Sequence, residues 1–248
     1  MAKQVVKNAS LLLHSKQLAS HVNAIEFTAE AEVKEATNFA SDGWKENLQG
    51  IRSTNLSCEL MLENAEEPEK TLSDLVDNET SVPFTVTMTY PPADGDVALF
   101  TQVVSLQITR KLQVGELWSG SMRFGNQGHA QKGVILEYNA GRTATGDSTP
   151  LDMGEAVVEG GRLWIAVHVL EVSGTSPTLD LILESDADTG MATPTTRITV
   201  PQFTAVGSYI TYLAGPVTDE AYQIAATVGG SDTPTFQYVV AIGIEPAS

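Results

Sequence analysis

Alternation of apolar and polar residues is the main signal in the first half of the chain. From Ile25 to Val33 every second residue is apolar, and the residues between them are Glu or Thr. This period of two predicts strands that are buried on one face, since a helix would scatter the same residues around its axis. The same period recurs at residues 56–62, 84–90, 104–108 and 118–124. The first 130 residues are therefore expected to be mostly antiparallel strands.

The second half has short apolar runs separated by Gly, Pro, Thr, Ser and Asp. They lie at residues 134–138, 163–172, 179–184, 196–200, 209–213, 221–228 and 236–244. About seven short strands with frequent turn residues predict a β-sandwich or jelly roll. The Gly- and Asn-rich stretch at residues 125–133 separates this part from the first. We expect an all-β protein with two domains, residues 1–130 and 131–248.

Two segments interrupt the strands of the first domain. Pro68 suits the first position of a helix, and the stretch Glu69 to Asp77 predicts one short flanking helix of about two turns. The stretch Lys34 to Asn55 carries Phe39, Trp44 and Ile51 among polar residues. It is too long for an ordinary hairpin turn, and we expect a functional loop there.

Charge narrows the classes of function. The 248 residues include 14 Lys and Arg against 31 Asp and Glu, a net charge of -17, of which -7 falls before residue 131 and -10 after it. Such a chain repels nucleic-acid backbones, so non-specific binding by counterion release is not expected. No run of 18 apolar residues is present to span a membrane. The single Cys58 excludes an intramolecular disulfide and fits a chain made and kept in a cytoplasm.

Catalytic and metal-binding patterns are missing from the sequence. The four histidines (His14, His21, His129, His168) have no spacing typical of a zinc site. Asp186, Asp188 and Gly190 resemble the start of a calcium loop, but Gly190 comes one residue early and Arg197 replaces the last carboxylate. We assign no catalytic, cofactor-binding or metal residues and expect no enzyme. The tryptophans (Trp44, Trp118, Trp164) fit a core better than a sugar-binding face.

Acidic residues occupy alternate strand positions. Glu26, Glu30 and Glu32 lie on one expected strand, and Glu59 and Glu63 on another. If the two strands belong to one sheet, these carboxylates share a face. Two interpretations stay open: a surface that only keeps the sheet soluble, or one that faces a polyanion without holding it.

The sequence also resembles a known family. Residues 18–27, 36–50 and 56–60 resemble the N-terminal part of major tail (tail tube) proteins of long-tailed, siphovirus-type bacteriophages, with Thr37, Gly43, Trp44 and Gly50 in the family's places. The chain departs from the family at Asn38, at Gln49, where proline is frequent, and at Arg52-Ser53. Residues 134–244 look like a segment from the same class of phage proteins.

The resemblance implies a tail-tube-type β-sandwich that forms hexameric rings, which stack into a hollow tube for DNA passage during ejection. It implies a virion protein, assembled in the bacterial host cytoplasm, with tape measure, distal tail and terminator proteins as partners and no membrane contact. The C-terminal domain is then expected on the tube exterior. Under this interpretation the lumen face of the tube includes residues from the acidic set (Glu26, Glu30, Glu32, Glu59, Glu63). The loop Lys34 to Asn55 is then expected to contact other subunits.

A different class of function stays open. A capsid decoration protein, or a phage receptor- or carbohydrate-binding protein, would use the Thr-, Gly- and Pro-rich second domain. Such a protein is expected to remain a monomer or trimer. A hydrolase on a jelly roll would need a cleft with two carboxylates of different pKa, and nothing in the sequence supports it.

Overall fold

The protein is built from β-strands. A computed structural model describes residues 9–18, 22–35, 47–61, 81–111, 113, 114, 116, 119–126 and 130–247. Every regular element among these residues is a strand, as the sequence pattern predicts. The expected short helix at Glu69 to Asp77 lies outside the described residues.

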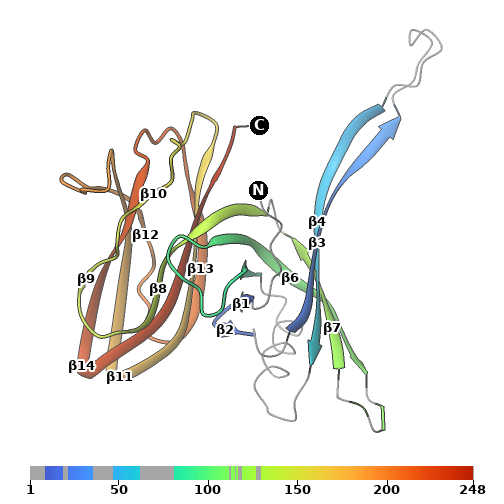
Figure 1. Ribbon diagram of the computed structural model, residues 1–248, viewed down its shortest axis with the longest axis horizontal. Helices are drawn as coiled ribbons and strands as arrows, with labels where there is room; N and C mark the ends of the chain where they lie inside the picture. Colours follow the sequence, from blue (N-terminus) through green and yellow to red (C-terminus); the bar gives the residue numbers. More distant parts are fainter. Residues whose placement is uncertain are drawn as a thin grey trace. The chain divides into compact units, whose positions relative to one another are not determined.

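The chain forms two compact units. Unit 1 contains residues 1–20, 82–102 and 131–248, and unit 2 contains residues 21–81 and 103–130. The strands of unit 2 are β3 (Val22–Glu35), β4 (Asn47–Met61) and β7 (Ser119–Asn126), and β6 (Val97–Lys111) belongs to both units (Figure 1). Unit 1 contains β1 (Ser10–Leu13), β2 (Lys16–Gln17), β5 (Val82–Thr87), β8 (Gln131–Arg142), β9 (Gly146–Asp147), β10 (Leu151–Asp152), β11 (Arg162–Asp186), β12 (Thr195–Thr199), β13 (Gly207–Ala214) and β14 (Ala221–Glu245).

The boundaries of these units differ from those of the expected domains, residues 1–130 and 131–248. The chain does pass from unit 2 to unit 1 between residues 130 and 131, but residues 1–20 and 82–102 group with the second half of the chain. The cause is long-range pairing, because the N-terminal part of β6 pairs with β8 and β5 pairs with β1. Such contacts leave no periodic signal in the sequence.

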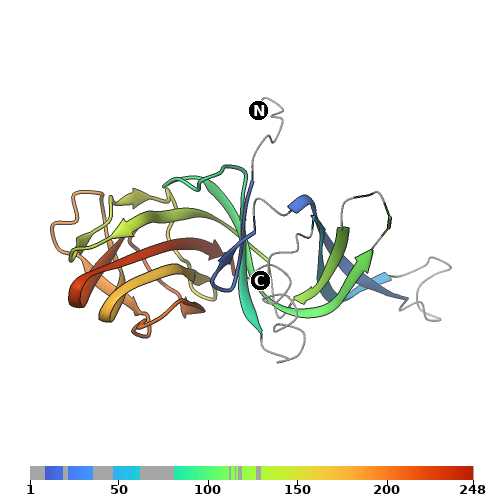
Figure 2. The same cartoon turned by 90° about the horizontal axis from the view of Figure 1, so that it is seen from below.

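Two very long strands form the frame of unit 1. β11 and β14 have 25 residues each and pair antiparallel from Arg162 opposite Glu245 to Asp186 opposite Ala221. The sequence predicts two separate strands in each of these stretches. In the structure the paired strands continue through both and turn back together midway (Figures 1 and 2). The resulting two-stranded ribbon is folded over on itself.

Glycines make the fold-over possible. The register shifts between Ser173 and Thr178 of β11, where Gly174 has φ +105°, and Gly230 of β14 has φ +118°. These backbone angles suit glycine, since a side chain is strained there. A Cβ atom on Gly230 would lie 2.8 Å from the carbonyl oxygen of Ser176. The bend therefore requires a small residue on each strand.

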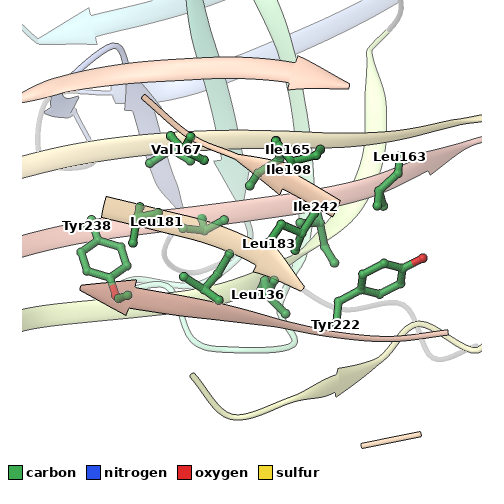
Figure 3. Packing of buried hydrophobic residues seen from close by; sticks show 14 of the residues in the cluster. Leu136, Leu163, Ile165, Val167, Leu181, Leu183, Ile198, Tyr222, Tyr238 and Ile242 are labelled. Atoms are coloured by element: carbon green, nitrogen blue, oxygen red, sulfur yellow. The ribbon is translucent and has the colours of Figure 1, made fainter. Parts of the chain in front are cut away.

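The core of unit 1 lies between the two halves of the ribbon (Figure 3). Leu163, Ile165 and Val167 come from one half of β11, and Leu181 and Leu183 from the other half, and all are fully buried in one cluster. Burial of such aliphatic side chains contributes about 1.5–3 kcal/mol each. The fold-over thus turns one ribbon into the two layers of a sandwich.

The first half of β11 is buried on both faces. Ile165 to Val169 are all inaccessible, whereas in the second half only every second residue is. The extra cover comes from β1 and β6, whose Leu12 and Phe100 belong to a second buried cluster with Ala166. This matches the rule that strands covered on both faces show continuous apolar runs.

A buried histidine joins β11 to the turn after β1 and to β5. His168 is fully buried, and its Nδ1 lies 2.6 Å from the carbonyl oxygen of His14, to which it can only donate. Its Nε2 lies 2.8 Å from the Thr85 hydroxyl, which then donates to it. Both bonds fix a neutral imidazole. Desolvation by burial lowers the pKa of His168 from 6.5 to about 4.

The bend can be tested at Gly230. We expect Gly230→Ala to lower the free energy of unfolding by about 1–3 kcal/mol, because the backbone is strained at positive φ. Gly141→Ala is the control, since the nearest atom to its Cβ is 3.5 Å away. Urea unfolding measures both, and equal stability of the two variants would contradict the assignment of strain to the bend.

His168 predicts a dependence of stability on pH. A histidine whose pKa is lowered in the folded state stabilises above its ordinary pKa, and this contribution is lost as pH falls from 6.5 through about 4. The loss should approach about 3 kcal/mol of unfolding free energy. It should be missing from His168→Gln, so urea unfolding of both proteins at pH 7 and pH 4 is the measurement. Parallel pH profiles would contradict the prediction.

Candidate assembly surface

Unit 2 forms one antiparallel sheet in the order β3, β4, β7, β6. The register aligns residues across all four strands. Glu26 of β3 lies opposite Ser57 of β4, which lies opposite Arg123 of β7, which lies opposite Gln107 of β6. Rows of this kind define the two faces of the sheet.

One face of this sheet is apolar. Its buried side chains on β4 and β7 are Leu56, Cys58, Leu60, Met122 and Phe124. They alternate along each strand with polar residues of the other face, which explains the period of two in the sequence. Cys58 is thus a small buried apolar residue, and burial raises the pKa of its thiol to about 12.

The other face carries the acidic residues. Glu26 and Glu30 on β3 and Glu59 on β4 are exposed, and the register puts them on the same face. The expectation that these carboxylates share a face is confirmed for these three. They line a hollow of about 440 Å³ together with Thr28, Ser57 and Arg123. Glu32 is exposed beside a register shift of β3, and Glu63 lies outside the described residues.

Basic residues lie on the same face at the opposite side of the sheet. Arg123 on β7 is exposed, and so is Lys111 at the end of β6, opposite Ser119. Charge therefore changes sign across the sheet, from the acidic strands β3 and β4 to β7 and β6. Sequence analysis singled out the acidic residues and missed this division. The alternation of Gln107, Thr109 and Lys111 is a signal that could have indicated it.

The two outer strands of the sheet differ in how their outer edges are covered. Among the described strands β3 pairs only with β4, so its outer edge has no described partner strand. β6 pairs with β7 in unit 2 and also with β5 of unit 1, but β5 has six residues against the 15 of β6 and leaves most of the outer edge of β6 without a described partner strand. β3 has 14 residues, which corresponds to an edge of roughly 45 Å. Long exposed edges are sites where further strands add, so stable monomers usually block them.

The β3–β4 hairpin extends beyond the rest of the sheet. β7 reaches β4 only as far as Asn55 opposite Gly125, whereas the pairing of β3 with β4 continues to Glu35 opposite Asn47. We call the overhanging residues 29–35 and 47–54 the arm. A two-stranded hairpin is only marginally stable in water without further packing. The arm is therefore a candidate contact with another molecule.

The arm corrects the expected long loop at Lys34 to Asn55. Residues 47–55 belong to β4, and residues 34 and 35 belong to β3. A two-stranded segment without a third strand lacks the regular apolar alternation by which strands are recognised. Ile51 lies on β4, and Phe39 and Trp44 lie outside the described residues.

The other sequence candidates have structural roles where they are described. Asp186 accepts hydrogen bonds from the backbone N–H groups of Ala187 and Thr193, so it stabilises the β11–β12 turn. Trp164 is half-buried and donates to Glu245. His21, His129 and Trp118 lie outside the described residues. In the described part of the chain no three His, Cys, Asp or Glu side chains are grouped to hold a metal ion, and no helix could cross a membrane.

Unit 1 has a polar hollow of about 450 Å³ beside β8 and β9. Arg142 and Oε1 of Glu137 form an ion pair in it, and Oε2 of Glu137 is buried without a hydrogen-bond partner among the described residues. Arg142 donates to Glu137, to the Tyr238 hydroxyl and to the carbonyl oxygens of Ala144 and Gly146. Burial raises the pKa of Glu137, and Arg142 opposes that shift. Through Arg142 this cluster holds the segment after β8 in place.

Comparison with known proteins found no matching family model and no matching curated protein. Among solved structures, the chain is similar to a component of the virion of a native gene transfer agent particle, with TM-score 0.43 and 16% identity over 52% of this chain and 98% of that chain. It is also similar to the SPP1 tail tube, with TM-score 0.43 and 12% identity over 52% and 78%. The SPP1 Dit protein, a hub of the adsorption apparatus, matches with TM-score 0.37 and 12% identity over 95% and 98%. These are similarities only, and the function is inferred from the geometry of the chain itself.

The apolar face of unit 2 can be tested through Cys58. A pKa of about 12 instead of 9 lowers the thiolate fraction at pH 8 about a thousandfold. We therefore expect a thiol-reactive disulfide reagent to label the native protein only after urea is added. A Cys58→Ser/Thr109→Cys variant is the control, because Thr109 is exposed on the polar face. Rapid labelling of native Cys58 would contradict the burial of this face.

Proposed function

We propose that the protein is a structural, non-enzymatic component of a bacteriophage tail, and that unit 2 builds the wall of a hollow tube. The free edges of β3 and β6 carry this proposal. The two strands run in opposite directions in the order β3, β4, β7, β6. The β3 edge of one copy can therefore pair with the β6 edge of the next and continue the same antiparallel sheet.

Such a contact joins two different surfaces, so each added copy presents the same free edge again. Contacts of this type close into rings when the rotation per copy allows it, and otherwise form filaments. A closed barrel removes both edges. The hexameric ring implied by the sequence resemblance is our specific proposal for this closure.

The hollow polar face supports its assignment to the tube lumen. The face that carries Glu26, Glu30 and Glu59 is hollowed, whereas the opposite face buries apolar side chains. A concave acidic wall repels a duplex over roughly a Debye length, about 8 Å at physiological salt. DNA would pass such a wall without adhering to it.

The arm supports stacking of rings. Residues 29–35 and 47–54 pair only with each other among the described strands. We propose that the arm packs against a copy in the next ring, which would give it the support that a lone hairpin lacks. In this proposal unit 2 supplies the ring and the lumen, and unit 1 lies on the tube exterior.

Electron microscopy of the purified protein at rising concentration tests the proposal. We expect six-fold rings or long hollow tubes, and sedimentation should give particles much heavier than one chain. A protein that remains a monomer or trimer at all concentrations would overturn the tube and favour the decoration or receptor-binding class.

The assignment of the polar face to the tube lumen can be tested at Glu59, which lies on β4 away from both outer edges of the sheet. We expect Glu59→Lys to assemble normally and to retain duplex DNA in a salt-dependent manner, because each copy replaces a repelling charge with an attracting one. Fluorescence anisotropy of a labelled duplex measures this retention. Glu171→Lys, on an exposed position of unit 1, is the matched control. Equal DNA retention by both variants would contradict the lumen assignment.

A further inference from the structure

The two free edges of unit 2 differ in charge. On the hollow polar face, β3 carries Glu26 and Glu30 at its free edge, and β6 ends with Lys111. All three side chains are exposed, and no ion pair to any of them is seen in the described residues. Glu32, further along β3, lies 3.6 Å from Lys34 and is compensated within its own strand.

The division of charge discriminates between the ways in which two copies can join. A symmetric contact through two β3 edges would place carboxylates opposite carboxylates, which destabilises a strand pair. A symmetric contact through two β6 edges is antiparallel, so it places Lys111 at each end of the joint and pairs no opposite charges across it. Only the contact of β3 with β6 puts opposite charges side by side. That contact continues around a ring, whereas the symmetric contacts end at a dimer.

The positions of the charges along the strands are compatible with this joint. Lys111 aligns through Ser119 with Met61, one residue beyond Leu60, which lies opposite Val22. Lys111 is thus about four residues from the level of Glu26. A closed barrel requires a stagger between strands, and a shear of one residue per strand gives about four residues over four strands.

We propose that the joint between copies is charge-matched: Lys111 on the β6 edge of one copy faces Glu26 on the β3 edge of the next, and Glu30 adds to the negative charge of that edge. This inference rests on the proposed ring. The matched charges select the contact that continues the ring over the symmetric dimers, and they steer the edges together before backbone hydrogen bonds form. Salt should therefore slow ring formation.

Two charge-reversed variants test the joint. One is Glu26→Lys/Glu30→Lys, which makes the β3 edge basic, and the other is Lys111→Glu, which makes the β6 edge acidic. Each variant alone places like charges at every joint. We expect the concentration needed for assembly to rise at least about tenfold for each. Thermal unfolding of the unassembled proteins should change little, since the substituted residues are exposed.

An equal mixture of the two variants is the decisive sample. The reversed β3 edge of one variant matches the reversed β6 edge of the other, and the two remaining edges are unchanged. Alternating copies can therefore close an even-membered ring with opposite charges at each joint. We expect the mixture to form rings near the wild-type concentration, as measured by sedimentation and electron microscopy. Glu155→Lys/Glu159→Lys in unit 1 has the same net charge change as the first variant and should assemble like the wild type.

The possible results separate the inference from the proposed function. Variants that each assemble like the wild type would overturn the charge-matched joint and leave the tube intact. Failure of the mixture, with both variants folded and the wild type forming rings, would also overturn it. A wild-type protein that forms no rings would overturn the tube, and the joint with it.

Discussion

The hydrogen-bonding groups at the edges of β-sheets are the constraint on which this structure depends. Every outer strand presents backbone N–H and C=O groups that need partners. In unit 1 the chain meets much of this need internally, because β14 pairs with β11, β8, β9 and β10. In unit 2 the described strands leave the outer edge of β3 unpaired, and the short β5 covers only part of the outer edge of β6. The difference between the units is the reason to assign assembly to unit 2.

The charged residues of unit 2 indicate a function only when they are considered together with those edges. Three carboxylates on an exposed sheet face are a common means of solubility, and alone they favour no function. These carboxylates lie on a hollow face between the edge strands β3 and β6, which run in opposite directions. Copies joined through these edges would repeat the acidic face along the assembly. The basic end of β6 makes the two edges different in charge, which favours joining the β3 edge of one copy to the β6 edge of the next.

Sequence reasoning found the strands that alternate and missed features that depend on distant contacts. The strand at Ile25 to Val33 was predictable because one face is exposed and the other apolar. β11 and β14 were each divided in two, since Gly174, Pro177 and Gly230 are typical turn residues. Here they bend a continuous ribbon. The burial of His168 was unpredictable, because its cover comes from β1 and β5, more than 80 residues away along the chain.

The place of β14 in the chain order affects how the molecule can be made. The described strands of unit 2 precede residue 127, whereas the central strand of unit 1 is residues 221–245. A ribosome therefore completes the sheet of unit 2 while unit 1 still lacks the strand that pairs with β8 and with all of β11. Until β14 emerges, β11 can pair only with β12 and β13, and the strand that pairs along its whole length is missing. A nascent chain of this protein therefore keeps apolar surface of β11 exposed until late in translation, which is a state prone to aggregation.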